Sequence, residues 1–304
     1  MVQYPNWGHP DHDACGTGFV AKLGRPVDHE VVQYALTALE RLTHRGGMDA
    51  DGASGDGAGL LLSLPDLFFR AQAKKQRVVL PEEFGIGQAF FPNGSVRDAQ
   101  AIIENTAREE HLRVLGWRQV PVDAASLGPL ALHTKPEIWQ FFVGPAGQDC
   151  AGLPMERQLT FLRKRLERKL PANSYICSLS SRTIVYKGLL TPWQLLLFYE
   201  DLRDPTFAAS FAIFHQRYST NTQPSWNLAQ PFRHVAHNGE INTIVSNRRW
   251  LRAKEPTIRE NLNADPWFQA LEDNVSDSAS FDNGFEIKLL EGMSAEEAML
   301  ALEV

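Results

Sequence analysis

The sequence predicts an α+β fold built in layers, and three observations support this. Runs rich in β-branched and aromatic residues alternate with segments of helical periodicity. The 304 residues are 43% hydrophobic and 22% charged, an ordinary globular composition with enough apolar surface for a stable core. The sequence shows no internal repeat and no low-complexity tract. This length allows one large domain or two modest ones, and the alternation of strands and helices favours a layered sandwich.

The elements of the first part of the chain follow a cysteine close to its start. An apolar run over residues 19–23 predicts a strand shortly after Cys15. Asp28 is expected to cap a helix over residues 29–44, because apolar residues recur on one of its faces. Further on we expect a strand over 60–64, a helix from a Ser95/Asp98 capping box to about Leu115, a helix over 155–169 with Leu159, Leu162 and Leu166 inward, and strands over 175–180 and 183–188.

The first expected helix ends at Thr43-His44-Arg45-Gly46-Gly47, and a glycine-rich loop over residues 49–59 follows it. It carries Asp49, Asp51 and Asp56 and lacks the Gly-Lys-Ser/Thr ending of a phosphate-binding loop. Its acidic side chains would repel anions. We therefore expect the glycines to let the backbone turn tightly beside a small-molecule pocket.

The last part of the chain contains three helix starts with clear capping residues. Thr191-Pro192 predicts a helix to about Asp201, Ser276-Asp277-Ser278 one over 279–290, and Ser294 with Glu297 a final one. We also expect a strand over 207–214, a turn at Asn238-Gly239 and a helix over 242–255.

Charge and cysteine usage exclude several classes of function. The formal net charge of −6 gives no support to nucleic-acid binding, and the basic run 163–169 is expected to be a solvated helix face. Cys15, Cys150 and Cys177 are widely spaced and form no metal-ligand pattern, so we expect no metal site and a reducing compartment. Cys177, in an expected strand, is predicted to be a core thiol, and Cys150 has no evident partner.

The chain is expected to be soluble and cytoplasmic, with no membrane partner. Residues 1–14 are polar and lack the apolar core of a secretory signal. No later apolar run is long enough to span a bilayer.

Cys15 is the candidate nucleophile, although Cys-Gly alone is weak evidence and an incidental cysteine is the simpler reading. No histidine pair can be assigned to it as a base from the sequence. If the chain were cut between Ala14 and Cys15, the new α-amine, with a pKa of about 7.7–8.0, could take the thiol proton. In the uncut chain that nitrogen is a non-basic amide, so cleavage would switch the activity on.

Four further residues would suit an amino-acid amide as the substrate. Arg217 offers a planar fork for a carboxylate, and Asp277 can receive an ammonium group. Asn238 and Gly239 offer N–H groups to a tetrahedral oxyanion. Together these groups describe free glutamine or asparagine. Taken singly, each has a simpler reading, namely a surface ion pair for Arg217, a hairpin turn for Asn238-Gly239 and a helix cap for Asp277.

Several sequence blocks, in order along the chain, resemble one known family. They are similar to the glutamine amidotransferase domain of glutamate synthases. The blocks are Cys-Gly-Thr-Gly-Phe (15–19), Thr-His-Arg-Gly-Gly (43–47), Gly-Asp-Gly-Ala-Gly (55–59), Ser-Leu-Ser-Ser-Arg-Thr-Ile-Val-Tyr-Lys-Gly (178–188), Phe-His-Gln-Arg-Tyr-Ser-Thr-Asn-Thr (214–222), His-Asn-Gly-Glu-Ile-Asn-Thr (237–243) and Ser-Asp-Ser-Ala (276–279).

The resemblance implies a class II amidotransferase of the N-terminal-nucleophile hydrolase type, with a four-layer αββα sandwich. It further implies glutamine hydrolysis through a thioester on the cysteine. The implied roles are nucleophile and base for Cys15, oxyanion binding for Asn238 and Gly239, and substrate binding for Arg217, Thr220 and Asp277.

The resemblance also implies how the chain is organised. Residues 1–14 would be a propeptide, and residues 15–304 an amidotransferase domain whose C-terminal part lies outside this sequence. Ammonia would pass to a synthase domain or subunit, also outside it, that carries FMN and an iron–sulfur cluster and reductively aminates 2-oxoglutarate. No cofactor is expected in this chain.

Two alternatives remain open from the sequence. The chain could be a truncated, non-catalytic piece that binds glutamine or a synthase partner without hydrolysing anything. It could also be a hydrolase of the same fold that acts on a different acid amide.

Overall fold

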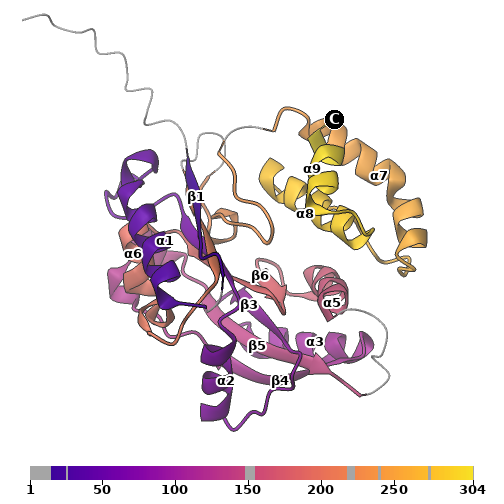
Figure 1. Cartoon of the computed structure of the whole chain (residues 1–304), viewed down its shortest axis with the longest axis horizontal. Coiled ribbons are helices and arrows are strands. Elements are labelled where there is room, and N and C mark those ends of the chain that lie inside the picture. The colour runs from indigo at the N-terminus through magenta and orange to yellow at the C-terminus, as the bar shows by residue number, and fades with distance from the viewer. Residues whose placement is uncertain are drawn as a thin grey trace, which may run out of the picture.

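Two antiparallel sheets form the centre of the computed structural model (Figure 1). The structure describes residues 15–24, 27–147, 155–217, 223–238, 241–272 and 275–303. The first sheet has the order β1-β8-β2-β7 and the second β4-β5-β3-β6. The strands of the first are β1 (Gly16–Ala21), β2 (Ala58–Ser63), β7 (Thr183–Gly188) and β8 (Phe211–Gln216). Those of the second are β3 (Gly85–Phe91), β4 (Leu112–Gln119), β5 (Glu137–Pro145) and β6 (Tyr175–Ser180).

Alternating side chains of the second sheet enter two different cores. In β5, Phe142 belongs to the core shared with Leu60 and Val185 of the first sheet, whereas Phe141 and Val143 belong to a separate core on the other face. This alternation follows from the two-residue period of a strand. Because both faces are covered, β3 is buried along its whole length.

Helices cover the outer face of each sheet. On the first sheet lie α1 (His29–Arg41) and α6 (Pro192–Phe198), and on the second α3 (Val96–Glu109) and α5 (Met155–Lys169) (Figure 1). The order of helices, sheet, sheet and helices confirms the expected αββα sandwich. Shorter elements complete the layers, namely α2 (Asp66–Lys75), α4 (Pro129–His133) and 3-10 turns at Thr43–Arg45, Ala124–Ser126, Glu200–Arg203 and Trp226–Leu228.

Three C-terminal helices form a group beside α5 (Figure 1). They are α7 (Ile244–Asn261), α8 (Asp277–Leu290) and α9 (Ala295–Glu303), and they share a core of their own with residues of the segment 262–271. The capping predictions are confirmed here. Ser276 accepts a hydrogen bond from the backbone of Ala279, and Ser294 and Glu297 bond to each other's backbone N–H.

The prediction for the basic run was wrong. Arg163 and Lys164 are only 1% and 4% exposed, because α8 and the segment before it cover this side of α5. Arg163 forms ion pairs with Glu167 and Glu286, and the Lys164 Nζ donates to the Ala270 carbonyl at 3.0 Å. Only the end of the run is exposed to solvent.

Several predicted boundaries also needed correction. The helix expected to reach Leu115 ends at Glu109, because His111 has a positive φ of 56° and Leu112 already begins β4. Ser95 makes no side-chain cap, since its hydroxyl donates to the Pro92 carbonyl. The first strand covers Gly16–Ala21 instead of 19–23, and the strand expected over 207–214 covers Phe211–Gln216.

The prediction for Cys177 is confirmed, since its side chain is fully buried and burial raises the pKa of its thiol to about 12. Cys150 lies outside the described residues.

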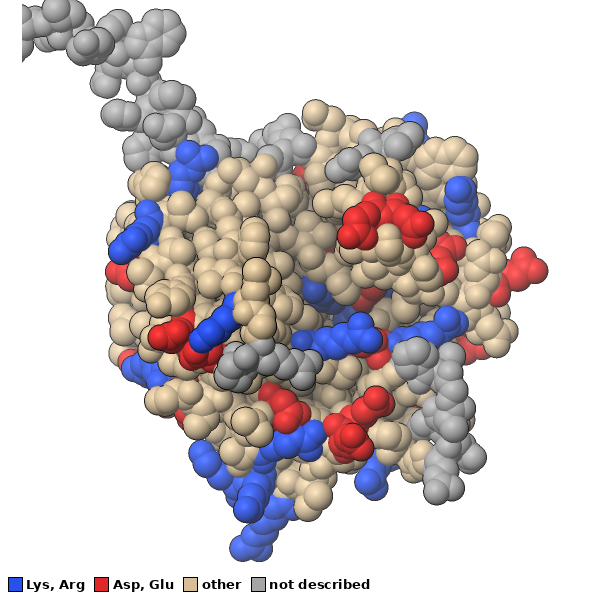
Figure 2. Space-filling model, in the orientation of Figure 1, with Lys and Arg blue, Asp and Glu red and all other residues tan. Residues whose placement is uncertain are grey.

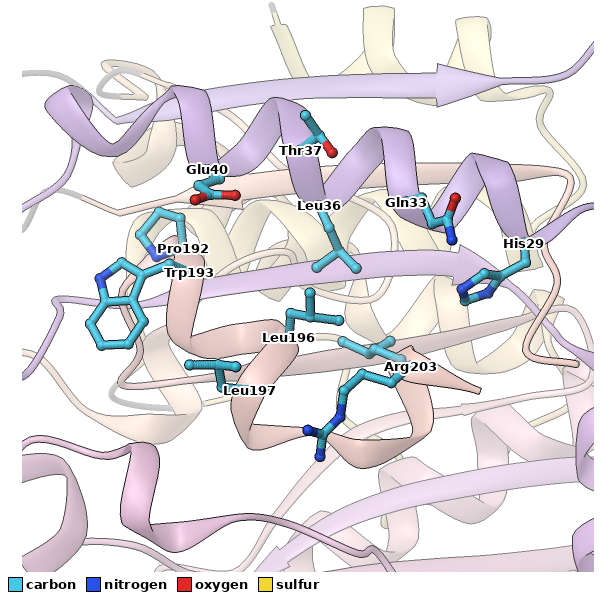
Figure 3. A pocket seen from close by; sticks show the side chains of 11 residues that line it. His29, Gln33, Leu36, Thr37, Glu40, Pro192, Trp193, Leu196, Leu197 and Arg203 are labelled. Atoms are coloured by element: carbon cyan, nitrogen blue, oxygen red, sulfur yellow. The ribbon is translucent and has the colours of Figure 1, made fainter. Parts of the chain in front are cut away.

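Within the described ranges, no helix is long and apolar enough to cross a bilayer. On the face shown in Figure 2, acidic and basic side chains are interspersed among uncharged ones. A groove of about 660 Å³ runs between α1 and α6, where Leu36 and Leu196 point toward each other (Figure 3).

We predict that two arginines of the same basic run differ sharply in their contribution to stability. Arg163→Ala should lower the free energy of unfolding by about 3 kcal/mol, because it leaves the Glu286 carboxylate buried without its nearest cation. Arg168→Ala, on the exposed side of α5, should cost less than about 1 kcal/mol. Urea unfolding of both variants checks this, and equal losses would contradict it.

Candidate functional site

Cys15 and Arg217 lie at the same end of the first sheet. Strands β1 and β8 are antiparallel, with Gly16 opposite Gln216, so the residue before β1 and the residue after β8 meet at this end. Cys15 is half-buried, and Arg217 is only 8% exposed. The pairing of two strands distant in sequence therefore places the predicted nucleophile beside the predicted carboxylate-binding cation.

The two glycine motifs form the neighbouring backbone. Arg217 donates its backbone N–H to the Gly57 carbonyl at 2.8 Å, and its own carbonyl accepts from the Gly47 N–H at 3.1 Å. A Cβ at Gly46 would lie 1.6 Å from the Gln216 Nε2, and one at Gly47 would lie 2.1 Å from the Asp56 Oδ2. A side chain is therefore excluded at Gly46 by β8 and at Gly47 by the Asp56 carboxylate of the same loop.

The charges around Arg217 link it to the other predicted residues. Burial lowers the pKa of Arg217, and its electrostatic interactions with Asp56, Cys15 and Asp277 act in the opposite direction. Cys15 and Asp277 thus lie within electrostatic reach of the guanidinium, which stays protonated. A molecule bound at this end of the sheet would meet a cation, a carboxylate and a thiol.

Asp277 is the first residue of α8, and Ser276 is the cap. The Asp277 Oδ1 accepts from the Ser278 backbone N–H at 2.7 Å and from the Ser278 hydroxyl at 3.2 Å. The carboxylate is therefore held against the start of its own helix.

Asn238 is exposed, at the end of the described segment 223–238. Its neighbour His237 reaches α8, where the His237 Nε2 lies 2.6 Å from the Ser278 Oγ. The predicted Gly239 and Thr220 lie outside the described residues, as do residues 1–14.

Side chains that were not predicted from the sequence also position the segment that leads to Asn238. Asp282 of α8 is fully buried and accepts hydrogen bonds from the backbone N–H groups of His234 and Val235, at 2.7 and 3.1 Å. Arg233 lies 3.2 Å from the same carboxylate. These contacts fix the segment that leads to Asn238. Asp282 stands outside the recognised motifs and gave no sequence signal.

His215 holds the same segment from the sheet side. Its Nε2 donates to the His237 carbonyl at 3.0 Å, and its side chain is fully buried. Both histidines lie within recognised motifs, so their positions, but not this contact, could have been noted from the sequence. Among the residues that the structure describes, no group of three or more His, Cys, Asp or Glu side chains could hold a metal ion.

We predict that His215 makes stability depend on pH. Burial lowers the pKa of His215 to about 3, whereas the unfolded side chain titrates near 6.5. The unfolded chain therefore binds one more proton between these values. The stability contributed by the neutral imidazole is present above pH 6.5 and is lost as the pH falls toward 3, by about 1.4 kcal/mol per pH unit.

The matched variant for this prediction is His215→Gln, which cannot titrate. Its free energy of unfolding should approach that of the wild type as the pH falls from about 7 to about 5. Urea unfolding at several pH values measures this difference, and parallel curves for the two proteins would contradict it.

Comparison with known proteins shows which family this chain belongs to. The model of the family "Glutamine amidotransferases class-II" matches residues 15–303. The chain is 42% identical over 309 residues to ferredoxin-dependent glutamate synthase 1, chloroplastic/mitochondrial, of Arabidopsis thaliana, covering 96% of this chain and 19% of that protein. It is 40% identical over 303 residues to the NADPH glutamate synthase large chain of Bacillus subtilis, covering 96% of this chain and 20% of that protein.

A third relative is covered to a similar extent. Ferredoxin-dependent glutamate synthase 2 of Synechocystis is 40% identical over 304 residues, covering 97% of this chain and 20% of its own length. The chain thus spans about a fifth of the length of the relatives it matches. With nearly its whole length matched by the family model, this chain belongs to the class II glutamine amidotransferases.

Proposed function

We propose that this chain hydrolyses L-glutamine to L-glutamate and ammonia through a thioester on Cys15. The observation that carries the proposal is that Cys15 and Arg217 lie at one end of the first sheet, with Asp277 within electrostatic reach of the Arg217 guanidinium, in a chain of this family. Each of the three has a partner group in free glutamine, namely the side-chain amide carbon, the α-carboxylate and the α-ammonium.

Arg217 and Asp277 bind the two charged groups of the amino acid in this proposal. A guanidinium presents a planar pair of donors that matches a carboxylate, and the buried position of Arg217 strengthens this charge-assisted contact. Asp277, fixed against the start of α8, accepts the ammonium group. Thr220 is proposed to lie beside the bound substrate. With both ends held, the side-chain amide is directed at Cys15.

The chemistry proceeds from an N-terminal cysteine. After cleavage between Ala14 and Cys15, the α-amine, with a pKa of about 7.7–8.0, takes the thiol proton. The sulfur attacks the amide carbon, and the side-chain N–H of Asn238 and the backbone N–H of Gly239 stabilise the oxyanion. The proton passes to the leaving nitrogen, ammonia departs, and water hydrolyses the thioester. The family-model match, which begins at Cys15, supports residues 1–14 being a propeptide.

The ammonia is proposed to serve a glutamate synthase. The matched relatives are named as ferredoxin-dependent and NADPH glutamate synthases, about five times longer than this chain. A synthase domain or subunit outside these residues would use the ammonia to aminate 2-oxoglutarate reductively, with its own FMN and iron–sulfur cluster. A cytoplasmic location remains the prediction for this protein.

The amine-base mechanism predicts a specific N-terminus. Intact-mass measurement of the active protein should show a chain that begins at Cys15, because only a free α-amine there can accept the thiol proton. Cys15→Ala should reduce glutamate release by at least about 1,000-fold while glutamine binding persists. Full turnover by a chain that retains Met1 would contradict the mechanism. If the wild-type protein bound glutamine but released no glutamate, the non-catalytic alternative would hold.

The proposed substrate contacts predict separate losses for the two charged groups. Arg217→Lys and Asp277→Asn should each raise KM for glutamine by about 10- to 100-fold, because each weakens or removes a charge-assisted hydrogen bond worth about 1.5–3 kcal/mol. Steady-state kinetics with glutamine and asparagine provide the measurement. An unchanged KM in both variants, or turnover of neither glutamine nor asparagine by the wild-type protein, would favour a different acid amide as substrate.

A further inference from the structure

His237 and Ser278 connect the two halves of the proposed glutamine site. His237 directly precedes Asn238, the proposed oxyanion donor, and Ser278 directly follows Asp277, the proposed ammonium acceptor. The His237 Nε2 and the Ser278 Oγ lie 2.6 Å apart. One hydrogen bond therefore joins the residues beside two groups that act on opposite ends of the substrate.

His237 is held at three points by three different parts of the fold. Its backbone N–H donates to the Gln230 Oε1 at 3.2 Å, its carbonyl accepts from the His215 Nε2 at 3.0 Å, and its ring contacts Ser278. The three partners come from the segment itself, from β8 and from α8. The backbone immediately before Asn238 is thereby fixed to the sheet and to the helix at once.

On the α8 side, the Ser278 hydroxyl contacts His237, Asp277 and Gln230. It donates to the Asp277 Oδ1 at 3.2 Å, and the Gln230 Nε2 donates to it at 3.5 Å. With its proton directed at Asp277, the oxygen accepts from the His237 Nε2, which then carries the imidazole hydrogen. Ser278 is only 6% exposed, so solvent offers little replacement for these contacts.

We propose that Ser278 and His237 are positioning residues that couple the ammonium-binding carboxylate of Asp277 to the oxyanion donor Asn238. This inference rests on the proposed function. Ser278 touches no reacting atom. It acts through His237, because a shift in the His237 backbone moves Asn238 away from the place where the oxyanion forms.

The effect of such a shift falls on turnover more than on binding. An oxyanion donor is useful only when it lies at hydrogen-bond distance from the charge that develops in the transition state, and a misplacement of about 1 Å can cost about 100-fold in rate. The Ser278 backbone N–H, which also holds Asp277, survives substitution of the side chain. Loss of the hydroxyl should therefore lower kcat and leave KM nearly unchanged.

The test is Ser278→Ala in the full chain, assayed for glutamate release from glutamine. We expect kcat to fall by about 10- to 100-fold with KM changed by less than about 3-fold, and Ser278→Thr, which keeps the hydroxyl, to recover most of the loss. The matched control is Ser280→Ala. This serine is also buried in α8, but its Oγ accepts from the Arg248 Nε at 2.9 Å instead of contacting His237. The Ser280→Ala variant should therefore keep the wild-type kcat.

A double variant separates positioning from general destabilisation. If Ser278 acts through Asn238, then Ser278→Ala should cause little further loss in an Asn238→Ala background. An equal loss in both backgrounds, an equal loss in Ser280→Ala, or wild-type kcat in Ser278→Ala would each overturn the inference while leaving the proposed function intact. Absence of glutamate release by the wild-type protein would instead refute the proposed function.

Discussion

The pairing of β1 with β8 is the constraint on which the candidate site depends. The two strands are the first and the last strand of the described residues, and β8 also pairs with β2 in the middle of the sheet. Closing so long a loop costs conformational entropy, which burial of Leu60, Leu61 and Phe214 against the helices and the second sheet helps to offset. The register then decides function, because a slip by one residue would turn every side chain of β1 to the other face.

The second requirement is the attachment of α8 to the sandwich. Buried charges on α5 meet buried carboxylates on α8, and Asp282 binds the backbone of the segment that leads to Asn238. A buried ion pair is weak evidence for high stability, since desolvation offsets much of the attraction. Removing one partner of such a pair is nevertheless strongly destabilising, because it leaves the other charge buried and unpaired. The network therefore fixes where α8 lies, and with it Asp277 and Ser278, relative to the sheet.

Local signals in the sequence predicted local structure well. The helix start at Thr191-Pro192, the Ser294/Glu297 cap, the strands over 175–180 and 183–188, and the inward leucines of α5 all depend on neighbours close in sequence. Predictions failed where distant segments intervene. Arg163 and Lys164 lie in a helical pattern that predicts exposure to solvent, but α8 covers both side chains. The end of α3 was missed because His111 adopts a left-handed backbone conformation, which is uncommon for a residue other than glycine.

What the sequence by itself determined is the set of chemical groups: a cysteine followed by glycine, an arginine after a strand, an Asn-Gly turn and an aspartate at a helix start, in motifs that also identified the family. Only the tertiary structure decided which of them meet. Strand register brings Cys15 to Arg217, and the docking of α8 brings Asp277 within reach of the same guanidinium. The hydrogen bonds of His237 with His215 and Ser278 were invisible in the sequence, because contacts between segments so far apart follow from packing and not from local pattern.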